Sequence, residues 1–150
     1  MKPNWEEILK DRLQLYGHRN WLVIADSAYP AQSRPAIETV VADEEQTTVL
    51  ERTSAILAGC KHIKPIIYTD EELAFVHEED APGISSYREK LGILFAGAEV
   101  RVLPHEEIIA KLDQTCNQEG IALLWLILLA MAASVAGLYI VGYLANSLLG

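Results

Sequence analysis

Apolar side chains along the first 115 residues follow two alternating patterns. They recur at helical spacing from Trp5 to Tyr16, and after Gly17 they form a continuous run from Trp21 to Ala25. The first pattern predicts an amphipathic helix and the second a buried strand. The alternation continues, with strands expected at 37–41, 63–68 and 99–103 and helices at 43–58, 85–96 and 104–114. Strands that alternate with helices predict an α/β fold, in which a layered, largely parallel sheet carries flanking helices.

The last part of the chain has a different pattern. Every Asp, Glu, Lys and Arg lies at or before Glu119, and Ile121–Leu144 is an uncharged run of 24 residues. As a helix this run is about 36 Å long, against about 30 Å of hydrocarbon in a bilayer. The alternative is a core helix, which rarely exceeds about 14 residues without a polar face. The sequence therefore predicts two parts: an α/β domain at 1–118, in the cytoplasm, and a long apolar C-terminal helix at 119–150 that anchors it to a membrane.

Composition and motifs exclude several classes of function. The formal charge of −9 argues against a nucleic-acid partner, which needs a basic surface to meet phosphates. Cys60 and Cys116 lie far apart with no CxxC motif, which favours reduced thiols over a disulfide. The two "HEE" triplets, at 77 and 105, do not extend to HExxH, and there is no phosphate-binding glycine motif or GxSxG. The acidic clusters at 43–45 and 78–80 are interpreted as solvated helix ends, so we expect no metal and no cofactor.

Three ionisable residues flank the expected strands. Asp26 directly follows the first strand and His105 follows the last, while His18 lies at the other end of the first strand. In open α/β sheets ligands bind beyond the carboxyl ends of the strands. Histidine and aspartate at such positions suit acid–base chemistry on a polar, uncharged substrate.

Two stretches carry a family resemblance. "GHRNWLVIADSAYPAQS" at 17–33 resembles the D-ribose pyranase / L-fucose mutarotase (RbsD/FucU) family, whose members have Gly-His, a short apolar strand ending in Asp and a loop with Pro. "AEVRVLPHEEIIAKLDQT" at 98–115 is also similar to that family. The resemblance covers about residues 5–115. It implies an isomerase that interconverts anomeric or ring forms of a monosaccharide such as ribose or fucose, in ring-shaped homo-oligomers with the pocket between subunits.

The resemblance also implies roles for single residues. His18 is expected to be the catalytic proton donor, and Asp26 and His105 are expected to contact the sugar. Family members end in a Tyr-x-Asn segment within a C-terminal strand that completes the pocket. Here "YLAN" at 143–146 has a different spacing and lies in the apolar run, so we interpret it as a coincidence and expect weaker sugar affinity and turnover. Natural divergence, a fusion or an engineered chain are all compatible with this tail.

The spacing of His18 and Asp26 adds an argument from geometry. Eight residue steps separate them, about 26 Å if the chain is fully extended. One strand therefore holds the two side chains far apart, and they can share a pocket only if a neighbouring subunit supplies one of them. The alternative to a mutarotase is a non-catalytic sugar-binding or scaffold oligomer that is attached to a membrane through 121–144.

Overall fold

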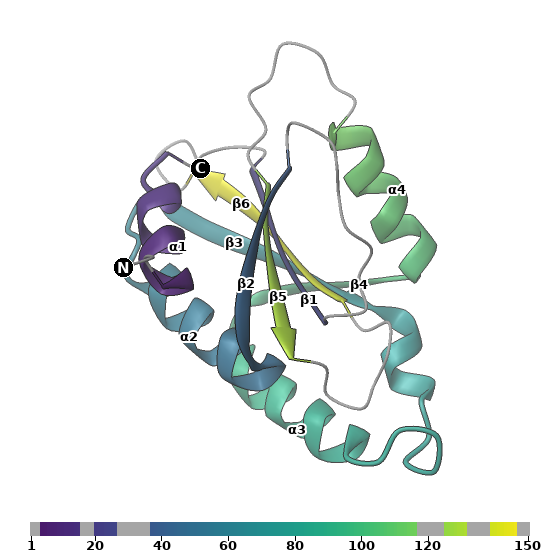
Figure 1. Cartoon of the computed structure of the whole chain (residues 1–150). Helices are drawn as coiled ribbons and strands as arrows, with labels where there is room; N and C mark the ends of the chain where they lie inside the picture. The colour runs from purple at the N-terminus through teal and green to yellow at the C-terminus, as the bar shows by residue number, and fades with distance from the viewer. Residues whose placement is uncertain (1–3, 16–19, 27–36, 117–124, 132–138, 147–150) are drawn as a thin grey trace.

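The computed structural model describes residues 4–15, 20–26, 37–116, 125–131 and 139–146 (Figure 1). Along the chain its elements are α1 (Trp5–Leu13), β1 (Asn20–Asp26), β2 (Ile37–Glu45), α2 (Gln46–Ala58), β3 (Ile63–Asp70), the 3₁₀ helix η1 (Glu71–Phe75), α3 (Ile84–Leu94), β4 (Glu99–Leu103), α4 (His105–Cys116), β5 (Trp125–Met131) and β6 (Tyr139–Asn146). The expected α/β fold is confirmed.

The six strands form one sheet in the order β2-β5-β1-β6-β3-β4. β5 pairs in parallel with both β2 and β1, and β3 pairs in parallel with β4. β6 is antiparallel to both of its neighbours, β1 and β3. The sheet is therefore largely parallel, as the alternating pattern predicts, and β6 runs against the other strands.

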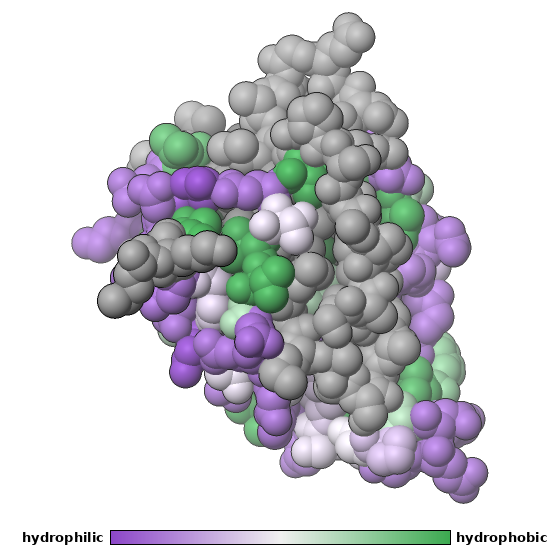
Figure 2. Space-filling model, viewed as in Figure 1, coloured by the Kyte–Doolittle hydropathy of each residue, from purple (hydrophilic) through white to green (hydrophobic). Residues whose placement is uncertain are grey.

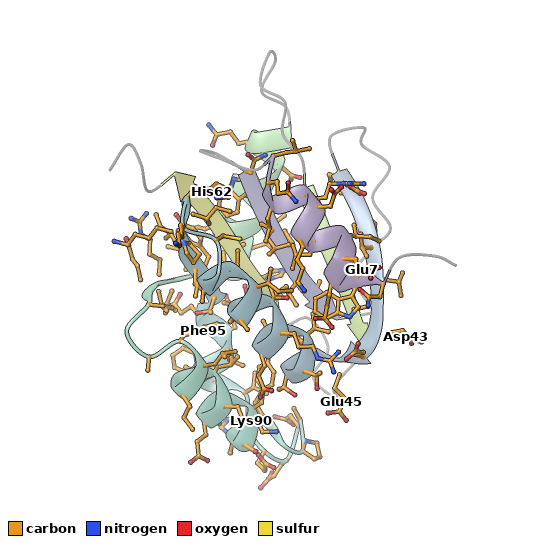
Figure 3. All side chains as sticks on the ribbon, turned by 90° about the vertical axis from the view of Figure 1, so that its left-hand side faces the viewer. Glu7, Asp43, Glu45, His62, Lys90 and Phe95 are labelled. Carbon is orange, nitrogen blue, oxygen red and sulfur yellow. The ribbon has the colours of Figure 1, made fainter. Side chains whose placement is uncertain are left out.

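Helices cover the sheet from both sides. α1, α2 and α3 lie on one side and α4 lies on the other (Figures 1 and 3). The main core forms under the first three helices, where Leu9, Leu50 and Ile84 are fully buried against Leu22 and Ile24 of β1. Alternate residues of a strand point to opposite faces, so Trp21 and Val23 face the side that carries α4.

The starts of the first two helices differ in how they are capped. At α1 the side chain of Asn4 accepts a hydrogen bond from the backbone of Glu7, and the Glu7 side chain accepts one from the backbone of Asn4. At α2 the N-cap residue Glu45 makes no side-chain cap hydrogen bond, and the helix expected from residue 43 begins only at Gln46. Asp43 belongs to β2 with a φ of 54°, and Gln46 is the buried first residue of the helix. Strand β2 continues further than its apolar residues indicate, so the helix starts later.

The C-terminal segment differs most from its expected structure. Residues 125–131 and 139–146 form β5 and β6 where the sequence predicts one helix over 121–144. β5 lies between β2 and β1, and β6 between β1 and β3. Inner strands of a sheet that is covered on both faces have continuous apolar runs, and so do membrane helices. The lack of polar residues in 121–144 therefore does not distinguish a membrane helix from inner strands. In the described ranges we find no helix with the length and apolar character needed to cross a bilayer.

Candidate functional site

Several strands end at one edge of the sheet and place candidate residues there. β1 ends at Asp26 and β3 at Asp70, while β4 ends at Leu103, two residues before His105. Ala25 lies opposite Tyr139 of β6, and Thr69 lies opposite the next residue of the same strand. Asp26 and Asp70 are therefore at the same edge with β6 between them, about 10 Å apart at the spacing of neighbouring strands.

The side chain of His105 contacts the buried carboxyl group at the end of β3. Nδ1 of His105 lies 3.1 Å from Oδ2 of Asp70. The Asp70 side chain is 3 % exposed, whereas that of His105 is 30 % exposed. A carboxylate can only accept a hydrogen bond, so the proton in this contact is on Nδ1 of the imidazole. The contact joins a buried acid to a histidine that reaches the surface.

The main chain at the start of α4 has a second acidic partner. The backbone N–H of His105 donates to both carboxylate oxygens of Glu72, at 3.0 and 3.2 Å. Glu72 belongs to η1, which follows β3 directly. Acidic side chains stabilise a helix N-terminus, where backbone N–H groups have no partner within the helix. Residue 105 is thus held through its side chain and through its backbone by one short segment, 70–72.

An aromatic pair with two basic side chains lies on the α4 side of the sheet. The rings of Trp21 and Tyr68 have centroids 5.4 Å apart. The guanidinium of Arg101 and the ammonium of Lys111 lie 5.9 and 6.0 Å from the centre of the Tyr68 ring. Arg101 donates to the Tyr68 hydroxyl at 3.2 Å and pairs with Glu99 at 2.9 Å. These two contacts, with Glu99 the stronger, raise the pKa of Arg101.

Reading the sequence alone misses Asp70 and Glu72. The apolar pattern ends the third strand at Tyr68, but the strand continues to Asp70. The available signal is the "TDEE" stretch at 69–72, where Asp70 comes two positions after the predicted strand, much as Asp26 follows the first strand. That signal predicts an acid at the carboxyl edge, but it does not identify His105, 35 residues away, as its partner.

The other sequence-predicted residues have different positions. His18 lies outside the described residues, two positions before the start of β1. It therefore precedes the amino end of β1, whereas Asp26 is its last residue. "YLAN" at 143–146 belongs to β6, whose Leu144 lies opposite Asn20. The C-terminal strand that the family resemblance implies is present, and our reading of "YLAN" as part of a helix is corrected.

Two hollows on the described surface differ in their distance from this edge. The larger one, about 580 Å³, lies between α1 and α2 and is lined by Glu6, Lys10 and Arg52 among others. A smaller one of about 260 Å³ is lined by residues of β3, η1, α3 and β4, among them Thr69 and Leu73, the chain neighbours of Asp70 and Glu72. The described surface seen in Figure 2 is hydrophilic along its margins, and its hydrophobic residues lie in small separate groups. Within the described residues, no group of three or more His, Cys, Asp and Glu could hold a metal ion. The chemistry of this edge therefore centres on His105 and the acids around it.

The acidic cluster at 43–45 lies at the carboxyl end of β2, which runs parallel to β5. Asp43 and Glu45 are exposed at the margin of the molecule (Figure 3). Glu44 between them accepts hydrogen bonds from Trp5 and Arg52, each at 3.0 Å. The cluster is thus partly a solvated surface, as expected, and partly a link between β2 and the first two helices.

Comparison with known proteins gives a likeness in fold. The chain is similar to a solved structure of Bacillus subtilis RbsD complexed with D-ribose, with a TM-score of 0.58 and 17% sequence identity over 97% of each chain. No family model matches the chain, and no curated protein matches it. At this identity the likeness concerns the fold, and it agrees with the fold that the two sequence stretches imply.

Proposed function

We propose that the chain interconverts anomeric or ring forms of a monosaccharide such as ribose or fucose, by acid–base chemistry and without a cofactor. The observation that carries the proposal is the placement of Asp26 and His105 at one edge of a sheet whose fold is shared with a ribose-bound protein. A monosaccharide is polar and uncharged, which suits a site of histidine and carboxylate groups.

The chemistry assigns a role to each residue. Mutarotation requires a proton delivered to the ring oxygen and a proton removed from the anomeric hydroxyl. Histidine can perform either transfer near neutral pH, because its ordinary pKa is about 6.5. In the proposal His18 is the proton donor, and Asp26 and His105 bind sugar hydroxyls. These three roles come from the family resemblance and are the part that experiment has to test.

The length of β1 supports a pocket made by two copies of the chain. β1 has seven residues, about 20 Å of extended backbone. His18 precedes its amino end and Asp26 forms its carboxyl end. One copy would supply the edge with Asp26 and His105, and a neighbouring copy the edge with His18 and residues 143–146. A homo-oligomer is therefore part of the proposal.

Magnetisation transfer between the anomers of ribose and fucose tests the chemistry. We expect faster exchange with the protein than without it, and we expect His18→Ala to remove most of the gain, since general acid–base catalysis contributes about 10²–10⁴-fold. His77→Ala is the matched control, because His77 is an exposed histidine in the turn before α3. Equal rates for wild type and His18→Ala would exclude His18 from the mechanism.

A non-catalytic sugar-binding oligomer is the second candidate. The fold likeness is to a ribose complex, so it favours binding of a sugar as much as turnover. Titration of the protein with ribose, followed by the backbone amide signals of Asp70, Glu72 and His105, separates the two candidates. Shifts at this edge without faster anomer exchange indicate a binding protein.

The location of the protein is a further proposal from the sequence, with a cytoplasmic domain and membrane attachment through 121–144. Strands β5 and β6 offer a different way to bury the same apolar residues, inside the sheet. Fractionation without detergent distinguishes them. Protein in the membrane pellet supports attachment, and protein in the supernatant supports burial in the sheet.

A further inference from the structure

The carboxyl group of Asp70 is buried at the end of β3, where an ionised group needs compensation. Its side chain is 3 % exposed, and removing a carboxylate from water is costly unless hydrogen bonds replace the lost hydration. Nδ1 of His105 supplies such a bond at 3.1 Å. Because Asp70 belongs to the sheet, its carboxylate is a fixed point against which the imidazole can be oriented.

A second anchor acts on the backbone of the same histidine. Both oxygens of Glu72 accept from the N–H of His105, at 3.0 and 3.2 Å. Asp70 and Glu72 are two residues apart, and His105 is the first residue of α4. The Cα of His105 is therefore fixed by Glu72 and its ring by Asp70, and the two contacts together define where the imidazole lies.

We infer that Asp70 is a positioning residue for His105, which it holds as the tautomer with the proton on Nδ1. Nε2 then carries the lone pair and accepts a hydrogen bond from a hydroxyl group of the sugar. A carboxylate that fixes the tautomer of a histidine in this way is common in enzyme and metal sites. The inference rests on the proposed function for the identity of the ligand, and on the geometry alone for the tautomer.

A second histidine, His62, provides an internal comparison for the tautomer of His105. Nε2 of His62 lies 3.0 Å from the backbone oxygen of Leu13. A carbonyl oxygen only accepts, so the proton of His62 is on Nε2. His62 and His105 are thus expected to be opposite tautomers in one molecule.

Long-range ¹H–¹⁵N correlation of the histidine rings tests the inference on the full chain without sugar, at about pH 8, where an ordinary histidine is neutral. Assignment uses His62→Gln and His105→Gln. We expect protonated Nδ1 in His105 and protonated Nε2 in His62. A proton on Nε2 of His105 in the wild type overturns the inference.

Variants of Asp70 then test whether this residue fixes the tautomer of His105. Asp70→Asn should move the His105 proton to Nε2, because the amide N–H₂ can donate to Nδ1, while Asp70→Glu should retain the Nδ1–H form. Glu79→Gln is the control, since Glu79 is an exposed carboxylate before α3. An unchanged His105 tautomer in folded Asp70→Asn contradicts a positioning role for Asp70.

Anomer exchange separates this inference from the proposed function. If both hold, Asp70→Asn lowers the exchange rate by about 10²-fold, the usual effect of a misplaced group, and Asp70→Glu restores part of it. The predicted tautomers together with no exchange and no sugar binding in the wild type count against the proposed function and support the positioning of His105.

Discussion

The ring of Trp21 packs against the ring of Tyr68 with centroids 5.4 Å apart and planes inclined by 33°, although β6 separates their strands. Both side chains are buried. The pair therefore joins β1 to β3 across an intervening strand, and it links the two halves of the sheet through side chains as well as through backbone hydrogen bonds.

We expect Trp21→Ala to lower the free energy of unfolding by about 3–5 kcal/mol, the usual cost of removing a buried aromatic side chain. A double-mutant cycle with Tyr68→Ala should give a coupling of about 0.5–1.5 kcal/mol, measured by urea unfolding. Trp5 is the control, because it is the buried first residue of α1, on the other side of the sheet. Its cycle with Tyr68 should be additive, and equal coupling in both cycles would contradict a specific contact.

Acid should weaken the start of α3 through Glu78. Its oxygens accept from the backbone N–H of Gly83 at 2.7 Å and of Ser85 at 3.0 Å. These backbone hydrogen bonds, and one from the Ser85 side chain, lower the pKa of Glu78 below 4.5. A pKa that is lower in the folded state stabilises the fold above pH 4.5, and this stability is lost as the pH falls through the folded value.

Hydrogen exchange of the first amides of α3, followed from pH 6 to about pH 3, measures this effect. We expect their protection to fall below pH 4.5 in the wild type, beyond any change elsewhere, and to depend less on pH in Glu78→Gln. Glu79→Gln is again the neighbouring control and should behave as the wild type. The same pH dependence in all three proteins would show that Glu78 does not cause it.

Removal of residues 119–150 tests whether 1–118 is a domain by itself, as the sequence predicts. From the sheet order we expect the truncated chain not to fold, because it loses β5 and β6 from the middle of the sheet. β1 would then have no paired strand on either side. Circular dichroism and a urea transition provide the measurement, and a cooperative transition in the truncated chain would show that the C-terminal segment is a separate part.

Mixing two inactive variants tests the pocket between copies. His18→Ala and Asp26→Ala each lack one of the groups at opposite ends of β1. If each pocket takes these groups from two neighbouring copies, random assembly restores about a quarter of the wild-type activity. Light scattering provides the independent measurement. A monomer, or a mixture as inactive as either variant alone, would contradict a shared pocket.

The sequence pattern correctly predicts those elements whose bounds are fixed by nearby residues in the chain. The strand expected at 99–103 is β4, with the same bounds, because "AG" before it and Pro104 after it limit the apolar run on both sides. Likewise Gly59 ends α2 where expected. In these segments local turn residues and apolar spacing indicate the same element, so tertiary contacts did not have to be known.

The C-terminal strands and the His105 contact depend on distant residues. Ile127 lies in the sheet beside Val23 and Thr39, which are 104 and 88 positions earlier in the chain (127 − 23 and 127 − 39). No local sequence window contains these partners. Its apolar run fits a helix equally well. The pair of His105 and Asp70 arises from the parallel register that places Asp70 opposite Leu103. A sequence can indicate both strand ends, but only the sheet brings them together.

The position of β6 between β1 and β3 has a consequence for folding during synthesis. A ribosome makes the chain from its N-terminus, so β1 emerges long before residues 139–146, which pair with it. Contacts between residues so distant in sequence are slow to form. Until residues 125–146 have been made, β1 has neither of its partner strands, and its unpaired edges can pair with other chains.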